Sequence, residues 1–348
     1  MPDEKTKKSK YISYLLRFAV AAGALYLAFR GENLREVGKI LLGVKPGTFA
    51  IALLAYMVGQ LIFVIRWRIL LRVLSIEIGL LPAANLTFLG LFYNNCLPGS
   101  VGGDFLRAWY VTKHTHKRFE AALSVFVDRA IGLAGMFIMA FACYWFIPAG
   151  SRQGKFTSKL VGADFFQKLS DYKETIAAGC AVFAVAVIIF LLTPKGRGVW
   201  SKTSKFINEH GVVIFNRTRT AARIYWGKKL IIIYALLLTF ACQSVSIIGI
   251  WLIGREIGAP ANVKYYFIFL PVSWLLGILP ISVGGAGIME WWLKIMFVEI
   301  GVPGGQALVL ALCQRFTWLI GSLPGAVIHL VGAHLPRDFS VDYDKGIN

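Results

Sequence analysis

Two arginines lie deep inside apolar segments of the chain, where an isolated charge is costly. Arg129 and Arg315 each lie about nine residues into such a segment, or roughly 13 Å at the helical rise of 1.5 Å per residue. An arginine near the centre of a bilayer costs on the order of 3 kcal/mol, so each one needs a partner. Asp104 and Glu290 are the candidate partners. Two interpretations stay open: structural salt bridges, or guanidinium groups that hold a phosphate through paired hydrogen bonds.

A glycine-rich motif occurs twice, close to these acids. LPGSVGG at Leu97–Gly103 returns as LPISVGG at Leu279–Gly285, with six of the seven positions identical. Glycine lets the backbone approach a ligand closely, and a helix that begins after such a turn presents free N–H groups to an anion. The two motifs, opposite two buried arginines, therefore predict a binding site for an anionic group.

The two copies of the motif differ in polarity. Three polar residues of the first copy have apolar or glycine counterparts in the second: Asn94, Asn95 and Asp104 correspond to Leu276, Gly277 and Ala286. The sequence leaves two roles open for Asn94 and Asn95. They could hydrogen-bond a sugar or glycerol headgroup, or they could pair with backbone groups of the broken segment around them.

The elements that carry these residues are apolar and long. The chain has 348 residues, of which 57% are hydrophobic, and a mean hydropathy of +0.64. Repeated runs of about 20 apolar residues are long enough to span a bilayer, so we expect an all-α, polytopic helical membrane protein. The predicted spans are Tyr11–Phe29, Gly47–Ile65, Glu120–Ile147, Thr175–Leu192, Leu230–Ile253 and Gln306–Val331. Proline and glycine interrupt two further apolar stretches, Ile78–Leu97 and Tyr265–Ile281, and the second is followed by Gly287–Ile300.

The distribution of basic residues favours one topology. If Ile78–Leu97 enters the membrane and returns on the same side, Arg107, Lys113, Lys117 and Arg118 join the N-terminus and other basic residues in the cytoplasm. That group includes Arg66, Arg68, Arg72 and the loop Pro194–Lys229. This re-entrant arrangement gives the stronger positive-inside bias. Broken backbone at membrane depth is tolerated where it lines a wet cavity, so we expect one beside the first motif.

Two halves of the chain share one plan. Each half contains, in order, a span with a glutamine (Gln60 or Gln243), a broken hairpin with the glycine motif, and a span with an arginine. We predict one transmembrane domain over 1–348, with repeats at 47–147 and 230–331 joined by a span and basic loop at 175–229. In the favoured topology the repeats are inverted, which is a recurring plan of secondary transporters. An old duplication retained only for folding is the alternative.

Several other classes of function lack support. The formal net charge of +19 is explained by basic cytoplasmic loops and attraction to anionic lipid, so we expect no nucleic-acid partner. The five cysteines are scattered and form no CxxC pair, so no metal site or cofactor is predicted. No GxSxG, HxxxxD, DxD or Walker A motif is present, so we assign no catalytic residue and expect no enzyme. Asp104, Asp128 and Glu290 are the acids considered for proton coupling.

These motifs carry a resemblance to a known family. NNCLPGSVGGDFLR, the R-x-x-GL of Arg129–Leu133, and the P-x-SxGGxGxxE of Pro280–Glu290 resemble the flippase-like family also called the lysylphosphatidylglycerol synthase transmembrane region. The resemblance implies a multi-pass protein of a bacterial or archaeal cell (inner) membrane, with a cytoplasmic N-terminus in our topology. Some members are fused to an aminoacyl-lipid synthase domain, which we do not expect here, so the resemblance does not imply aminoacyl transfer.

The resemblance also implies a function and a site. The expected activity is that of a lipid flippase or transporter, moving an anionic amphiphile such as a phospholipid, polyprenyl-phosphate or glycolipid between leaflets. The alternative is a non-transporting lipid-binding partner of a lipid synthase or glycosyltransferase. The motifs place a lipid-headgroup site at Asn95, Gly102, Gly103, Asp104, Arg107, Arg129, Gly284, Gly285, Glu290 and Arg315, to which the residue pattern adds Asn94.

Overall fold

A computed structural model describes residues 18–96, 102–113, 118–145, 225, 227–278 and 282–332, all of which fall in one compact unit. These residues form helices joined by turns, with no extended strand among them, which confirms the all-α prediction. The predicted span Thr175–Leu192, most of the basic loop and the Leu-Pro portions of both glycine motifs lie outside the described residues.

Four long helices match four of the predicted spans. They are α3 (Pro46–Val73), α6 (Arg118–Trp145), α12 (Lys229–Glu256) and α15 (Gly304–Val331). Each has 28 residues, or about 42 Å at 1.5 Å per residue, against a hydrocarbon thickness of about 30 Å. All four are apolar enough to cross a membrane, α6 over Phe119–Cys143.

Four short helices occupy the interrupted stretches. In the first half, α4 (Leu80–Cys96) is followed by α5 (Gly102–Lys113); in the second, α13 (Val263–Gly277) is followed by α14 (Ile288–Glu299). They have 17, 12, 15 and 12 residues, so each is shorter than the roughly 20 residues that a helix needs to span. In the second half, α13 continues through Pro271 and a turn separates it from α14, which confirms a break there. The residues between α4 and α5 lie outside the described residues, so the first break and the re-entrant path of both hairpins stay predictions.

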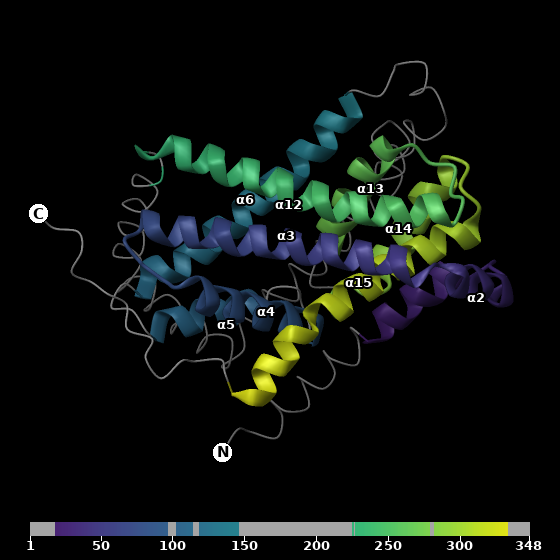
Figure 1. The fold of residues 1–348 in the computed structure, drawn as a ribbon. Helices are drawn as coiled ribbons and strands as arrows, with labels where there is room; N and C mark the ends of the chain where they lie inside the picture. Colours follow the sequence, from purple (N-terminus) through teal and green to yellow (C-terminus); the bar gives the residue numbers. More distant parts are fainter. Residues whose placement is uncertain are drawn as a thin grey trace, which may run out of the picture. The chain divides into compact units, whose positions relative to one another are not determined.

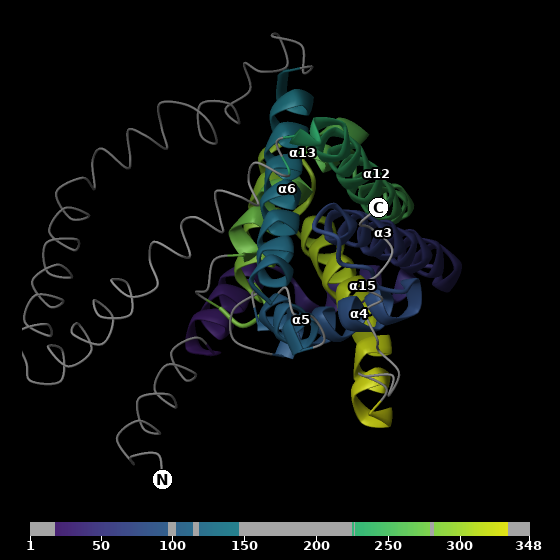
Figure 2. The ribbon, with the colours of Figure 1, turned by 90° about the vertical axis from the view of Figure 1, so that its left-hand side faces the viewer.

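The first long helices of the two halves, α3 and α12, pack side by side and antiparallel (Figures 1 and 2). Gly59 of α3 lies against Cys242 and Ser246, whereas Gly249, later in α12, lies against Ala52, earlier in α3. A Cβ atom at Gly59 would lie 2.7 Å from the Ser246 hydroxyl oxygen. Small residues therefore let the two backbones approach closely at this crossing.

The other helices pack across the two halves. The hairpin helix α4 of the first half packs against α15 of the second, and α13 of the second packs against α6 of the first. Two repeats of opposite orientation would produce this pattern, in which each hairpin packs on a long helix of the other half and α3 and α12 run antiparallel. The inversion relative to a membrane stays a prediction.

The N-terminal part of the chain packs on the second half. A helix at Phe18–Phe29 passes Gly287, where a Cβ atom would lie 2.4 Å from the Ala21 carbonyl oxygen. The buried Lys294 ammonium of α14 donates to the Ala28 carbonyl oxygen at 2.8 Å and pairs with Glu32 at 2.7 Å. These contacts fix the start of the described chain against the second hairpin.

Candidate functional site

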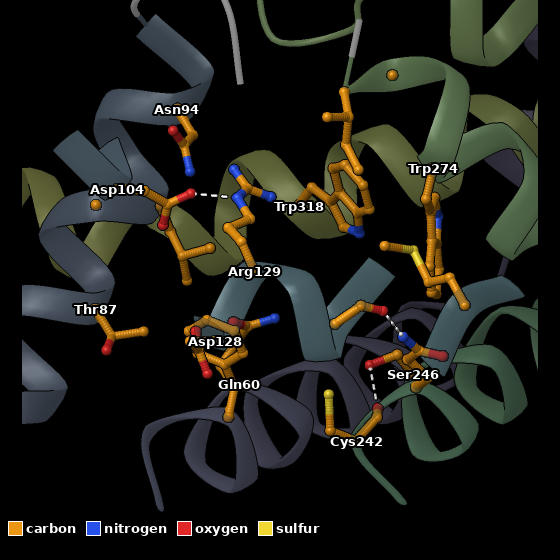
Figure 3. Close-up of a pocket in the computed structure, with 18 of the residues that line it drawn as sticks. Gln60, Thr87, Asn94, Asp104, Asp128, Arg129, Cys242, Ser246, Trp274 and Trp318 are labelled. Carbon is orange, nitrogen blue, oxygen red and sulfur yellow. Dashed lines mark hydrogen bonds and ion pairs between the residues drawn. The ribbon is translucent and has the colours of Figure 1, made fainter. Parts of the chain in front are cut away.

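Both halves of the chain line one cavity of about 240 Å³. Figure 3 shows the residues around it, which come from α3, α4, α5, α6, α12, α13, α14, α15 and the turn before α14. The two broken hairpins meet there, because a Cβ atom at Gly284 would lie 3.2 Å from the Asn94 carbonyl oxygen. Gly284 has φ +56°, a conformation that glycine adopts without strain. The cavity beside the motifs was expected.

The innermost charged group is the pair Arg66–Asp128. The Arg66 Nε atom donates to Asp128 Oδ1 at 2.9 Å, and Nη1 donates to the Thr239 hydroxyl at 2.7 Å. Both charged side chains are buried. The sequence placed Arg66 among cytoplasmic basic residues; the structure instead buries its side chain, because α3 continues past Ile65 to Val73 and brings Arg66 to Asp128.

Arg107 lies next to this pair and is only 2% exposed. Its Nη1 atom is 3.1 Å from Asp104 Oδ1 and 3.7 Å from Asp128 Oδ2, and its guanidinium carbon is 4.1 Å from the Trp67 ring centroid. Its Nε and Nη2 atoms have no hydrogen-bond partner in the described part of the chain. Buried polar groups are nearly always hydrogen-bonded, so two unpartnered donors on one guanidinium at a cavity need an explanation.

Arg129 completes the charged side of the cavity. Its Nε atom forms an ion pair with Asp104 Oδ2 (Figure 3). Its side chain is 31% exposed, far more than that of Arg107. Three arginines, Arg66, Arg107 and Arg129, thus face two carboxylates, Asp104 and Asp128. The excess of one positive charge in a poorly hydrated site favours an anion.

Arg315 and Glu290 form the second predicted pair, one layer away from the cavity. Arg315 Nε pairs with Glu290 Oε1, and Nη1 donates to the Gly284 carbonyl oxygen at 2.9 Å. Glu290 Oε2 accepts the Gly287 backbone N–H at 2.7 Å. Both acid–arginine pairings expected from the sequence are therefore present. Arg315, however, is not among the residues that line this cavity, and its contacts hold the glycine turn in place.

The glycine turns have partners of their own. The Gly103 N–H donates to Asn94 Oδ1 at 2.7 Å, so Asn94 pairs with the broken backbone, which was one of its two predicted roles. A Cβ atom at Gly103 would lie 1.8 Å from the Gly90 carbonyl oxygen, so this glycine permits α4 and α5 to touch. These two N–H groups, of Gly103 and Gly287, are bonded within the chain and are not available to an anion.

The candidate residues thus divide into two groups. Those that line the cavity are Asn94, Asn95, Asp104, Arg107, Arg129 and Gly284. Those that lie behind its lining are Gly102, Gly103, Gly285, Glu290 and Arg315. No cluster of His, Cys, Asp and Glu that could hold a metal ion occurs among residues 18–96, 102–113, 118–145, 227–278 and 282–332.

Sequence reasoning missed several lining residues. The sequence predicts Arg66 as a cytoplasmic charge and offers Asp128 only for proton coupling, and no motif contains Trp274 or Trp318. Gln60 and Gln243 were used only as markers of the repeat, yet both line the cavity. Their recurrence at equivalent places inside apolar spans was the signal that could have found them, since a polar side chain at that depth needs a partner.

Comparison with known proteins agrees with the fold. Residues 14–325 match the family model described as the lysylphosphatidylglycerol synthase TM region. A UPF0104 membrane protein of Methanocaldococcus jannaschii is 23% identical over 337 residues, covering 92% of this chain and 93% of that protein. A UPF0104 membrane protein of Methanothermobacter thermautotrophicus is 20% identical over 339 residues, covering 92% and 95%. The chain is a polytopic membrane protein and belongs to the lysylphosphatidylglycerol synthase transmembrane-region family.

Proposed function

We propose that this protein moves an anionic amphiphile, such as a phospholipid, polyprenyl-phosphate or glycolipid, between the leaflets of a bacterial or archaeal cell membrane. The observation that carries the proposal is the buried Arg107, which lines the cavity with two donors that have no partner among the described residues. A phosphate oxygen is the kind of acceptor that such donors prefer, and the bond is charge-assisted.

The size and charge of the cavity support a headgroup as the ligand. A volume of about 240 Å³ is below the 300–1,000 Å³ that is typical of sites for drug-sized molecules. It suits the head of a lipid and leaves the tails in the bilayer. The excess positive charge of the three arginines over two aspartates would be neutralised by one phosphate. Arg129, which is partly exposed, would meet the headgroup first as it enters.

The packing of the two halves supports lipid transport over lipid binding without transport. The cavity lies where the hairpins of the two halves meet, and each hairpin packs on a long helix of the opposite half. A rocking motion of one half against the other would open this site to alternate sides, as in transporters built from inverted repeats. Arg315 and Glu290 would keep the turn at Gly284 rigid during such a motion.

The alternative is a non-transporting membrane partner that binds the same lipid and presents it to a lipid synthase or glycosyltransferase. The same cavity would serve it, so binding alone does not separate the two. We propose a non-enzymatic role in either case.

Transport in sealed vesicles tests the proposal. Purified protein is reconstituted with an anionic phospholipid labelled on one acyl chain with a fluorophore, and dithionite is added outside to bleach the outer leaflet. Protein-free vesicles should lose about half of the signal. Vesicles with the wild-type protein, assayed with and without a pH gradient, should lose nearly all of it. Wild-type vesicles that bleach like protein-free ones, while retaining bound lipid, would support the partner role instead.

The most informative variant is Arg107→Gln, because each aspartate keeps another arginine. Asp104 keeps Arg129, and Asp128 keeps Arg66. We expect this variant to fold and to lose transport. Arg68→Gln is the matched control, since Arg68 donates to the Ile78 carbonyl oxygen at 2.8 Å and does not line the cavity. Full transport by Arg107→Gln would remove the anion site from the mechanism.

A further inference from the structure

The cavity has a second end, where Figure 3 labels no charged residue. Figure 3 shows Asn94, Asp104 and Arg129 on one side, and Trp274 and Ser246 on the other. A phosphate at the arginines leaves this neutral end for the rest of the headgroup. The polar atoms at this end therefore help to select the lipid. This inference rests on the proposed function.

Gln243 lines the cavity three residues before Ser246 on α12 and contributes an acceptor. Its Nε2 atom donates to the Gly132 carbonyl oxygen at 3.4 Å, which fixes the orientation of the amide. Its Oε1 atom is buried and has no hydrogen-bond partner in the described part of the chain, and the whole residue is only 7% exposed. Ser246 donates its hydroxyl hydrogen to the Cys242 carbonyl oxygen at 3.0 Å, so its oxygen can still accept. The Gln243 oxygen therefore lacks a donor that a ligand could supply, and the Ser246 oxygen can accept a second bond.

Trp274 contributes a donor. Its Nε1–H is buried and has no partner among the described residues, although Trp274 lines the cavity. An indole nitrogen only donates, so it requires an acceptor from the ligand. The rings of Trp274 and Trp318 lie 5.9 Å apart at 45°, and both residues line the same cavity. They give this end an apolar wall beside its few polar atoms.

Donor and acceptor requirements at one end discriminate between headgroups. An ammonium group donates but cannot accept from Trp274, and a second phosphate or carboxylate accepts but cannot donate to Gln243. A hydroxyl group does both. We infer that the lipid carries a neutral, hydroxylated group, a polyol or sugar, on the phosphate held by the arginines.

Competition between lipids with identical acyl chains tests this inference. Binding to the purified protein in detergent is measured by native mass spectrometry for phosphatidylinositol, phosphatidylglycerol, phosphatidylethanolamine and phosphatidic acid. We expect the two hydroxylated lipids to bind about tenfold more tightly than the other two. Tenfold in affinity is what one net hydrogen bond contributes at the upper end of its usual range. Soluble glycerol phosphate, even in excess, should not displace the bound lipids. Displacement would reassign the site to a soluble phosphate ester.

Two variants localise the preference. Gln243→Leu and Trp274→Phe each remove one hydrogen-bonding group, and both should lose most of the tenfold preference while still binding phosphatidic acid. Gln306→Leu is the matched control, because Gln306 also has a buried Oε1 atom with no partner among the described residues but does not line the cavity. Its preference should remain that of the wild type.

The outcomes separate this inference from the proposed function. Equal binding of all four lipids, or tightest binding of phosphatidylethanolamine, would overturn the inference and leave the anion site intact. A preference that survives in both Gln243→Leu and Trp274→Phe would also overturn it. Absence of binding for every anionic lipid would instead remove the proposed function, and the inference with it.

Discussion

Arg66 and Arg107 contact the same aspartate, yet their loss should affect stability very differently. Arg66 makes the close contacts to Asp128, with Nε and Nη2 both 2.9 Å from Oδ1, whereas Arg107 reaches Oδ2 at only 3.7 Å. Asp128 is 1% exposed. Arg66→Gln therefore leaves a buried carboxylate with one distant cation. Removing one partner of a buried ion pair typically costs about 3–5 kcal/mol, and we expect a loss of unfolding free energy in that range.

Arg107→Gln should change the free energy of unfolding by only about 1 kcal/mol in either direction. The variant loses one charge-assisted bond to Asp104 and the contact with the Trp67 ring, worth about 1.5–3 and 0.5–2 kcal/mol respectively. It also removes two buried donors that have no partner in the described part of the chain, which cost about 1–3 kcal/mol each. These contributions are of similar size and opposite sign.

Unfolding in mixed micelles with increasing SDS, followed by tryptophan fluorescence, measures both variants under one condition. The double variant Arg66→Gln/Asp128→Asn should recover about 2 kcal/mol relative to Arg66→Gln, because it removes the stranded carboxylate. Equal destabilisation by Arg66→Gln and Arg107→Gln would refute this reasoning. So would a double variant that is no more stable than Arg66→Gln alone.

Three further substitutions address the frame around the site. Gly59→Leu should lower the free energy of unfolding by about 1–3 kcal/mol in the same SDS titration, because even a Cβ atom there would lie 2.7 Å from a hydroxyl oxygen of α12. Gly38→Ala is its control and should be neutral or slightly stabilising, because an added Cβ atom would meet no atom of the described residues within 4 Å. Glu290→Gln should lower thermal stability by about 2 kcal/mol, because its arginine partner keeps its charge but loses the carboxylate. Lys294→Met should speed tryptic cleavage after Arg30 in native detergent solution, because the ammonium no longer holds the N-terminal segment; unchanged cleavage would show that apolar packing alone fixes this segment.

Hydropathy and local sequence were enough to predict the frame of the protein. The long helices follow from apolar run length, and the breaks follow from proline and glycine, which are local properties. The pairing of Arg129 with Asp104 and of Arg315 with Glu290 followed from the cost of leaving an arginine unpaired at that depth.

The finer arrangement of the site depends on contacts that the sequence does not encode locally. Arg66 follows an apolar run, which is typical of the aqueous end of a span. Its burial depends on hydrogen bonds to Asp128 and Thr239, which are distant in the sequence. Likewise, depth along a helix does not fix the direction in which a side chain points. For that reason the sequence could not distinguish Arg129, which lines the cavity, from Arg315, which supports a turn behind it.

The exchange of packing partners between the halves constrains how the protein is made. The first hairpin packs through α4 on α15, which is synthesised close to the end of the chain. At about 5–20 residues per second, the ribosome needs roughly 10–40 s after α5 to complete α15. During that time a hairpin that carries Asp104 and Arg107 lacks its eventual neighbour. Such an intermediate is a natural client for membrane chaperones, and truncations that remove α15 should expose the first hairpin to quality-control proteases.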